Sequence, residues 1–213
     1  MRPSSSIRSR LTTDRAVRSS SHAHRAATAS PFDVTDLDAV SAAVAGLGHI
    51  DVLVNNAGVP PAMGLEPFRT MDPERWEPAI ALSLRGVMVC TKALIDPMCE
   101  AGWGRIITIA SGAGTAGTRI GVSPYAAAKG GSIAFTRTLA LEVARKGVTA
   151  NSLALGMMST GDADLDAGLA RPVPVGRLGT PDDIGAACVW LASDEAAWVT
   201  GQTIEINGGA ITT

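Results

Sequence analysis

The sequence predicts an α/β fold in which a parallel sheet carries helices on both faces. Short apolar, β-branched runs alternate along the chain with longer segments whose apolar residues recur at helical spacing. Each run is closed by Gly, Asn or Ser, which are common turn residues. Because the runs are continuously apolar, we expect strands that are buried on both faces and paired in parallel through right-handed crossovers. A length of 213 residues fits one such domain.

Four strands are expected, and the polar segments that follow them define a ligand-binding edge. Ligands in parallel sheets bind beyond the carboxyl ends of the strands. The segments NNAG, SGAG and LGMM, which close the first three strands, are therefore expected at that edge. The predicted strands are Ile50–Val54, Arg105–Ala110, Val148–Leu155 and Gln202–Ile206.

Four helices are expected between and beside these strands. The last of them has Thr180 as a good N-cap and Pro181 as a good first residue. In the second, Pro97 is a candidate break, since proline disrupts the interior of a helix. The predicted helices are Asp36–Gly46, Pro73–Ala101, Pro124–Arg145 and Pro181–Ala192.

Composition limits the classes of partner. The formal net charge of -2 gives no reason to expect a nucleic acid or an anionic membrane as a partner. No apolar run approaches the roughly 18 residues that a membrane span needs. The three cysteines and three histidines show no metal-ligand spacing, so no metal site is predicted. We therefore expect a cytoplasmic protein with reduced thiols that acts on a small molecule.

The stretch SPYAAAKGG carries the strongest chemical signal. Tyr125 is the only tyrosine of the chain, and Lys129 is one of three lysines. On a helix that begins at Pro124 the two side chains share one face, with about 5–6 Å between their Cβ atoms. An ammonium close to a phenol favours the phenolate and lowers the phenol pKa from about 10 toward neutrality. That is the requirement for a tyrosine general acid/base.

Ser111 adds a hydroxyl at the end of the preceding strand. A hydroxyl there can bind a substrate carbonyl and stabilise the oxyanion that forms on proton transfer. A tyrosine four residues before a lysine is usually a surface pair. The scarcity of both residues, and the position of Ser111 and NNAG on the same edge, favour a catalytic site.

Together these motifs resemble the short-chain dehydrogenase/reductase family, from about residue 33 to the C-terminus. The resemblance implies a Rossmann-type fold, NAD or NADP as cofactor and reversible carbonyl reduction. It also implies a homodimer or homotetramer that pairs through the 73–101 and 124–145 helices. The matching segments are Asp33-Val34-Thr35, NNAG, Ser111, Tyr125-x-x-x-Lys129, Pro172–Gly179 and Thr200-Gly201-Gln202 with Asn207-Gly208-Gly209.

The resemblance implies a role for each site residue. Tyr125 is expected to be the acid/base, Lys129 to favour the phenolate and bind the nicotinamide ribose, and Ser111 to orient the carbonyl. Residues 157–172 are expected to form a loop over the substrate. The expected cofactor contacts are Asp33 and Val34 at the adenine, Asn56, Ala57 and Gly58 in the cleft, and Gly156, Met158 and Thr160 beside the nicotinamide, together with Tyr125 and Lys129.

The N-terminal part departs from the family. The family has a glycine-rich turn that binds the pyrophosphate, whereas no glycine precedes Gly46 here. We expect a catalytic domain over 33–213 that lacks the first strand and helix, which leaves Ile50–Val54 with an open edge. Residues 1–32 are rich in Arg and Ser. Within and just beyond them, 10–14, 15–27 and 28–34 are candidate remnants of the second strand, its helix and the third strand. An incomplete chain and an intact, divergent domain are the two interpretations.

Two single residues depart as well. Ser83 stands where the family has an asparagine that shapes a helix kink and holds a water in the proton relay. A serine can also bond a backbone carbonyl, so we expect slower catalysis rather than none. Leu155 replaces the usual proline before Gly156, and Gly156 alone is expected to keep the turn.

The main hypothesis is an NAD(P)-dependent oxidoreductase that reduces a ketone or oxidises a secondary alcohol, with 3-oxoacyl thioesters as one substrate class among several. The alternative is a catalytically impaired, truncated remnant that acts only through oligomer or partner contacts. Asp14 and Arg15 offer both an acid, which favours NAD, and an arginine, which favours NADP, so the choice of cofactor stays open.

Overall fold

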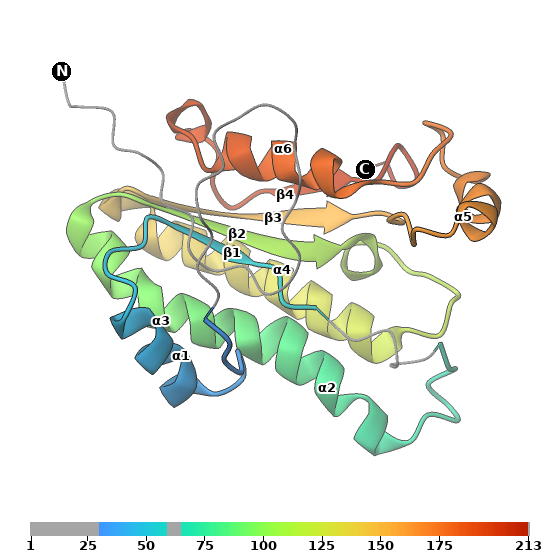
Figure 1. Cartoon of the computed structure of the whole chain (residues 1–213), viewed down its shortest axis with the longest axis horizontal. Helices are drawn as coiled ribbons and strands as arrows, with labels where there is room; N and C mark the ends of the chain where they lie inside the picture. The colour runs from blue at the N-terminus through green and yellow to red at the C-terminus, as the bar shows by residue number, and fades with distance from the viewer. Residues whose placement is uncertain (1–29, 59–64, 213) are drawn as a thin grey trace.

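The chain forms a sheet with helices on both of its faces (Figure 1). The computed structural model describes residues 30–58 and 65–212. Their four strands are parallel and lie in the order β1-β2-β3-β4. The predicted α/β class and all four predicted strands are confirmed. The observed strands are β1 (Val52–Asn55), β2 (Gly104–Ser111), β3 (Val148–Leu155) and β4 (Thr203–Ile206).

The helices are shared unequally between the two faces of the sheet. Helices α1, α3 and α4 cover one face, and α6 covers the other (Figure 1). All four predicted helical segments are confirmed. The α-helices are α1 (Leu37–Ala45), α2 (Glu77–Ile80), α3 (Gly86–Ala101), α4 (Ser123–Val143), α5 (Ala163–Ala170) and α6 (Pro181–Leu191).

Each face of the sheet has its own apolar core. On the α3 and α4 side, Ile106 of β2 packs in a cluster with Met98. On the α6 side, Ile107 and Leu153 pack in a cluster with Leu191. Neighbouring residues of β2 thus point to opposite faces, and both faces are buried. This burial explains why the strand reads as a continuous apolar run.

The long helical segment is built differently from the one expected. A π-helical turn, Ala81–Arg85, joins α2 to α3. Helix α3 then continues through Pro97 to Ala101, so the candidate break is wrong. The neighbouring Met98 is fully buried and packs closely on Gly104 of β2. We attribute the continuity to this packing, which offsets the helix hydrogen bond that proline removes.

Two other segments differ from expectation. Residues 30–34 form no strand, so that part of the expected third strand is wrong. The remaining N-terminal predictions lie outside the described residues. The expected loop 157–172 contains α5, whose first turn is capped by the Asp162 carboxylate through the N–H groups of Asp164 and Leu165 at 3.0 and 3.1 Å. An aspartate N-cap was a readable signal that the sequence analysis missed.

The stretch Pro73–Ala101 is long and apolar enough, by length and composition alone, to cross a membrane, contrary to the expectation from the sequence. In the folded chain it lies along the sheet, where Val87, Leu94 and Met98 are buried. A helix in the core of a soluble protein has the same composition, and this packing accounts for the apolar residues.

Candidate active site

The carboxyl ends of the strands meet at one edge of the sheet, and the predicted site residues gather there. Ser111 ends β2 directly beside Leu155, the last residue of β3. The segment Asn56–Gly58 follows the end of β1. Helix α4 begins at the same edge and runs back beneath the sheet (Figure 1). Four segments that are distant in sequence therefore meet at one edge of the sheet.

Tyr125 and Lys129 lie one turn apart near the start of α4, as predicted. The Nζ atom of Lys129 lies 5.8 Å from the centroid of the Tyr125 ring. Lys129 is only 5% exposed, whereas Tyr125 is half-buried. Pro124 in the first turn fixes the start of the helix, because its backbone is already set for that position. The structure thus places the ammonium near the Tyr125 ring and leaves the tyrosine partly exposed.

The Lys129 ammonium is buried with few partners. Its Nζ donates a hydrogen bond to the carbonyl oxygen of Ile109 at 2.6 Å. Burial lowers the pKa of Lys129 from 10.5 to about 8. An ammonium has three N–H donors, and Ile109 is its one hydrogen-bond acceptor within the described part of the chain. The remaining donors are available to a ligand.

Ser111 keeps a hydroxyl proton for a ligand. Its Oγ accepts a hydrogen bond from the N–H of Ala113 at 3.2 Å, at the start of a 3-10 turn over Gly112–Gly114. A hydroxyl that accepts one hydrogen bond can still donate its own proton to a carbonyl oxygen. This arrangement is consistent with the role expected for Ser111.

Ser83 lies inside the π-helical turn and is completely buried. Its Oγ makes no hydrogen bond within the described residues. The next residue, Leu84, packs against Gly131 of α4, where an added Cβ would lie 3.2 Å from Leu84 Cδ2. The turn therefore presses against the helix that carries Lys129. Because π turns recur at functional sites, the unpaired hydroxyl marks Ser83 as a candidate site residue.

Asp33 and Val34 have local contacts that organise the start of α1. The Asp33 carboxylate accepts hydrogen bonds from the N–H and the hydroxyl of Thr35 at 2.8 and 2.7 Å. These bonds hold the pKa of Asp33 below its usual value. Val34 packs on Gly86, where an added Cβ would lie 3.0 Å from Val34 Cγ2. Contact of either residue with an adenine stays a prediction.

The segment after β1 is anchored from below. Asn55 is buried, and its Nδ2 donates to the Thr91 hydroxyl at 3.3 Å. Asn56 and Gly58 are exposed and Ala57 is half-buried. The three predicted cleft residues are thus accessible at the site edge.

The turn after β3 depends on Gly156, as expected because Leu155 replaces the usual proline before it. A Cβ on Gly156 would lie 2.7 Å from the Asn207 Cα, so a side chain has no room there. Met158 then forms a single parallel bridge with Gly179. This bridge ties the segment after β3 to the segment that precedes α6.

Thr160 is held by helix α5. The Asp166 carboxylate accepts hydrogen bonds from the Thr160 N–H at 2.9 Å and from its hydroxyl at 2.7 Å. The same carboxylate accepts from the hydroxyl of Ser159 at 2.5 Å. These hydrogen bonds hold the pKa of Asp166 below its usual value. Helix α5, in the segment expected to lie over the substrate, is therefore linked to Thr160, which is expected to lie beside the nicotinamide.

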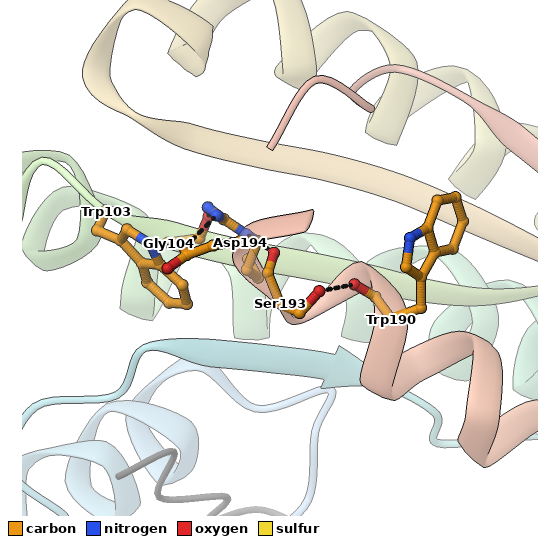
Figure 2. Close-up of polar contacts among 6 residues, drawn as sticks. Trp103, Gly104, Trp190, Ser193 and Asp194 are labelled. Carbon is orange, nitrogen blue, oxygen red and sulfur yellow. Dashed lines mark hydrogen bonds and ion pairs between the residues drawn. The ribbon is translucent and has the colours of Figure 1, made fainter. Parts of the chain in front are cut away.

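A second polar cluster lies at the opposite end of β2 and was missed from the sequence (Figure 2). Arg105 is 3% exposed and donates to the carbonyl oxygens of Gly104 and Ser193 at 3.0 and 3.3 Å. Its guanidinium also donates to the Asp194 carboxylate at 3.3 Å and lies 4.1 Å from the Trp103 ring centroid. Trp103 Nε1 donates to the same carboxylate at 3.1 Å. Burial lowers the pKa of Arg105, and Asp194 opposes that shift.

Comparison with known proteins identifies the family. Residues 6–211 match the family model described as Enoyl-(Acyl carrier protein) reductase. The chain belongs to the short-chain dehydrogenase/reductase family. This short-chain dehydrogenase/reductase is 43% identical over 170 residues to the 3-oxoacyl-[acyl-carrier-protein] reductase FabG of Escherichia coli, a match that covers 78% of the chain and 68% of that protein.

Two solved structures agree with the family assignment. A 3-oxoacyl-[acyl-carrier protein] reductase with bound NAD from Brucella melitensis has a TM-score of 0.79 and 34% identity, over 85% of this chain and 70% of that one. A gluconate 5-dehydrogenase from Burkholderia cenocepacia in complex with NADP and tartrate has a TM-score of 0.76 and 34% identity, over 84% and 73%. The short-chain dehydrogenase/reductase fold is therefore shown, and these two neighbours hold NAD and NADP.

The residues present fit the nicotinamide half of such a cofactor. The buried Lys129 amine has donors to spare, and Gly156 leaves its turn without a side chain. Contact of these residues with a nicotinamide stays a prediction.

Proposed function

We propose that this short-chain dehydrogenase/reductase reduces the ketone of a 3-oxoacyl thioester to a secondary alcohol with NADPH or NADH. The observation that carries the proposal is the buried Lys129 ammonium, which lies beside the half-buried Tyr125 with hydrogen-bond donors to spare. The similarity to a 3-oxoacyl-[acyl-carrier-protein] reductase supports the substrate class.

Each site residue then has a defined part in the reaction. The Tyr125 phenol donates its proton to the carbonyl oxygen, and Lys129 stabilises the phenolate that remains and binds the nicotinamide ribose. Ser111 donates a hydrogen bond to the same oxygen and stabilises its developing charge. A bound nicotinamide supplies the hydride. Further cofactor contacts are proposed for Asp33, Val34, Asn56, Ala57, Gly58, Gly156, Met158 and Thr160.

The test follows NADPH and NADH oxidation by the purified chain with acetoacetyl-CoA, and in parallel with a keto-sugar acid. We expect faster turnover of the thioester. Tyr125→Phe should lower kcat by about 10²–10⁴-fold, because the proton donor is removed. Lys129→Met should lower kcat to a similar degree. Lys92→Met, which changes an exposed lysine paired with Asp96 at 2.9 Å, is the matched control and should keep wild-type activity.

Two outcomes decide between the proposal and its alternative. A wild-type chain that oxidises neither cofactor, and whose melting temperature is unchanged at millimolar NADH or NADPH, would reject the enzyme and favour a remnant that acts through partner contacts.

Ser83 provides a finer test of the same site. Its unpaired hydroxyl stands where the family has an asparagine, and we propose that the shorter side chain slows proton relay to the site. Ser83→Asn should therefore raise kcat severalfold and leave the cofactor KM unchanged. An unchanged kcat would remove Ser83 from the catalytic machinery.

We also propose a cytoplasmic homodimer or homotetramer that pairs through the 73–101 and 124–145 helices. Exposed apolar side chains on these helices support it, since Met88 is 45% exposed and Leu141 is 77% exposed. Light scattering coupled to size-exclusion chromatography would measure the mass. A monomer at micromolar concentration would reject this assembly.

A further inference from the structure

The turn that follows Ser111 packs directly against the backbone of α4. A Cβ added to Gly114 would lie 2.8 Å from the Gly130 nitrogen and 2.9 Å from the Lys129 carbonyl carbon. Real Cβ atoms essentially never come so close to other heavy atoms, and ordinary contacts begin at 3.4 Å. Both obstacles are helix backbone rather than the end of a flexible side chain. Residue 114 is therefore glycine because the turn and the helix touch.

The same contact restricts Gly130 of α4, but less strictly than it restricts Gly114. A Cβ added to Gly130 would lie 3.3 Å from the Gly114 carbonyl oxygen, a tight contact that a small adjustment relieves. Gly117, three residues further along the same loop, has nothing within 4 Å of its added Cβ. The close approach is thus a local property of the first turn of the loop.

A second contact lies on the other side of Ser111 in the sequence. Lys129 Nζ donates to the carbonyl oxygen of Ile109 at 2.6 Å. Ile109 precedes Ser111 by two residues, and Gly114 follows it by three. The two contacts therefore join the strand end to the same helical turn, on both sides of Ser111.

We propose that Gly114 is a positioning residue that sets the spacing between the Ser111 hydroxyl and the Tyr125/Lys129 face of α4. The inference rests on the proposed carbonyl reduction, in which Ser111 and Tyr125 serve one oxygen. Reacting groups must be held to within about 0.5 Å, and a misplacement of about 1 Å can cost roughly 10²-fold in rate. An alanine at 114 forces a shift of that order.

The test compares three single glycine variants of the full chain. Gly114→Ala should lower kcat about 10²-fold with the cofactor KM within twofold of wild type, because the displaced group serves the reacting oxygen. Gly130→Ala should lower kcat about tenfold or less. Gly117→Ala is the matched control in the same loop and should retain wild-type kcat. Equal kcat values for Gly114→Ala and Gly117→Ala would overturn the proposal.

A double variant shows whether Gly114 acts through Ser111. If it does, Ser111→Ala with Gly114→Ala should be no slower than Ser111→Ala alone, since the group that Gly114 positions is already gone. Fully additive losses would overturn the proposal. If Gly114→Ala does not fold, the milder Gly130→Ala takes its place in the double variant.

A measurement without catalysis separates this inference from the proposed function. Amide hydrogen exchange of residues 111–117 and 129–131 should accelerate in Gly114→Ala and stay unchanged in Gly117→Ala. If the wild-type chain is inactive but the two variants differ in exchange, the carbonyl reduction is rejected and the packing of Gly114 against α4 is supported. If both variants exchange equally, the packing contact is rejected as well.

Discussion

The two ends of β2 each bury a cation, and the two cations are treated in opposite ways. At the amino end, Arg105 donates to Gly104, Ser193 and Asp194 and lies over the Trp103 ring. At the carboxyl end, Lys129 has a single carbonyl acceptor within the described residues and no carboxylate partner there. Their exposures are nearly equal, at 3% and 5%.

This contrast matches the structural role of Arg105 and the catalytic role proposed for Lys129. A guanidinium stays charged and satisfies its five donors in a fixed plane, whereas an ammonium shifts its pKa readily when buried. Arg105 fixes the end of α6 to the sheet through residues that follow the helix. Lys129 keeps its donors and its proton available beside Tyr125.

We expect the stability of the fold to depend on pH through Lys129. Because burial lowers the pKa of Lys129 from 10.5 to about 8, the unfolded chain binds more protons than the folded chain between those pH values. Stability contributed by this group therefore rises with pH from about 8 to 10.5. Below pH 8 the folded chain bears a charge penalty of roughly 3 kcal/mol at most.

Lys129→Met removes this penalty. At pH 7 its free energy of unfolding, measured in urea, should exceed that of the wild type by up to roughly 3 kcal/mol. The gain is reduced by the cost of leaving the Ile109 carbonyl without its hydrogen bond from Lys129. The rise between pH 8 and 10.5 should disappear, while Lys92→Met should retain it. A pH-independent difference between Lys129→Met and wild type would show that the amine carries no buried charge.

Arg105→Met should change stability with the opposite sign. Methionine replaces the aliphatic stem but has no N–H groups, so it leaves the carbonyls of Gly104 and Ser193 without the guanidinium donor. We expect the free energy of unfolding to fall by about 1–3 kcal/mol at pH 7. Arg145→Met, at an exposed arginine, serves as control and should match the wild type. Stabilisation by Arg105→Met would mean that the two cations are equivalent after all.

The smallest effect is expected for Asp194→Asn. The Asp194 side chain is 84% exposed, and an amide oxygen can still accept from Trp103 and Arg105. The loss should stay within about 1 kcal/mol and shrink in high salt, as for other exposed ion pairs. Urea unfolding at low and high ionic strength measures it. A larger loss that persists in high salt would show that the carboxylate, rather than the two carbonyls, holds Arg105.

Sequence reasoning succeeded where the signal was local. The strands could be read from β-branched runs, and Tyr125 and Lys129 share a helix face at a fixed spacing of four residues. The Arg105–Asp194 contact joins residues 89 positions apart, so no local pattern could reveal it. The close contact between Gly114 and Gly130 likewise depends on how a loop packs against a helix, which no local pattern reveals.

Two failures came from tertiary packing that overrides local preference. Proline rules predicted a break near Pro97, but the buried Met98 keeps the helix in place. The turn Ala81–Arg85 contains neither proline nor glycine, so nothing in its composition announces a π helix. The contacts of an adenine with Asp33 and Val34 stay predictions.

The π-helical turn also constrains how this chain can change in length. It holds one residue more than an α-helical turn, and the wider turn absorbs that extra residue. Loss of one residue between Ala81 and Arg85 would therefore close it to an α-helical turn and leave the preceding segment in nearly its present orientation. The fully enclosed Ala79 and the Phe68–Trp76 stack, with 5.2 Å between ring centroids, would keep their surroundings. A one-residue gap at this place between related sequences is therefore a marker of a lost π turn, not of a shortened loop.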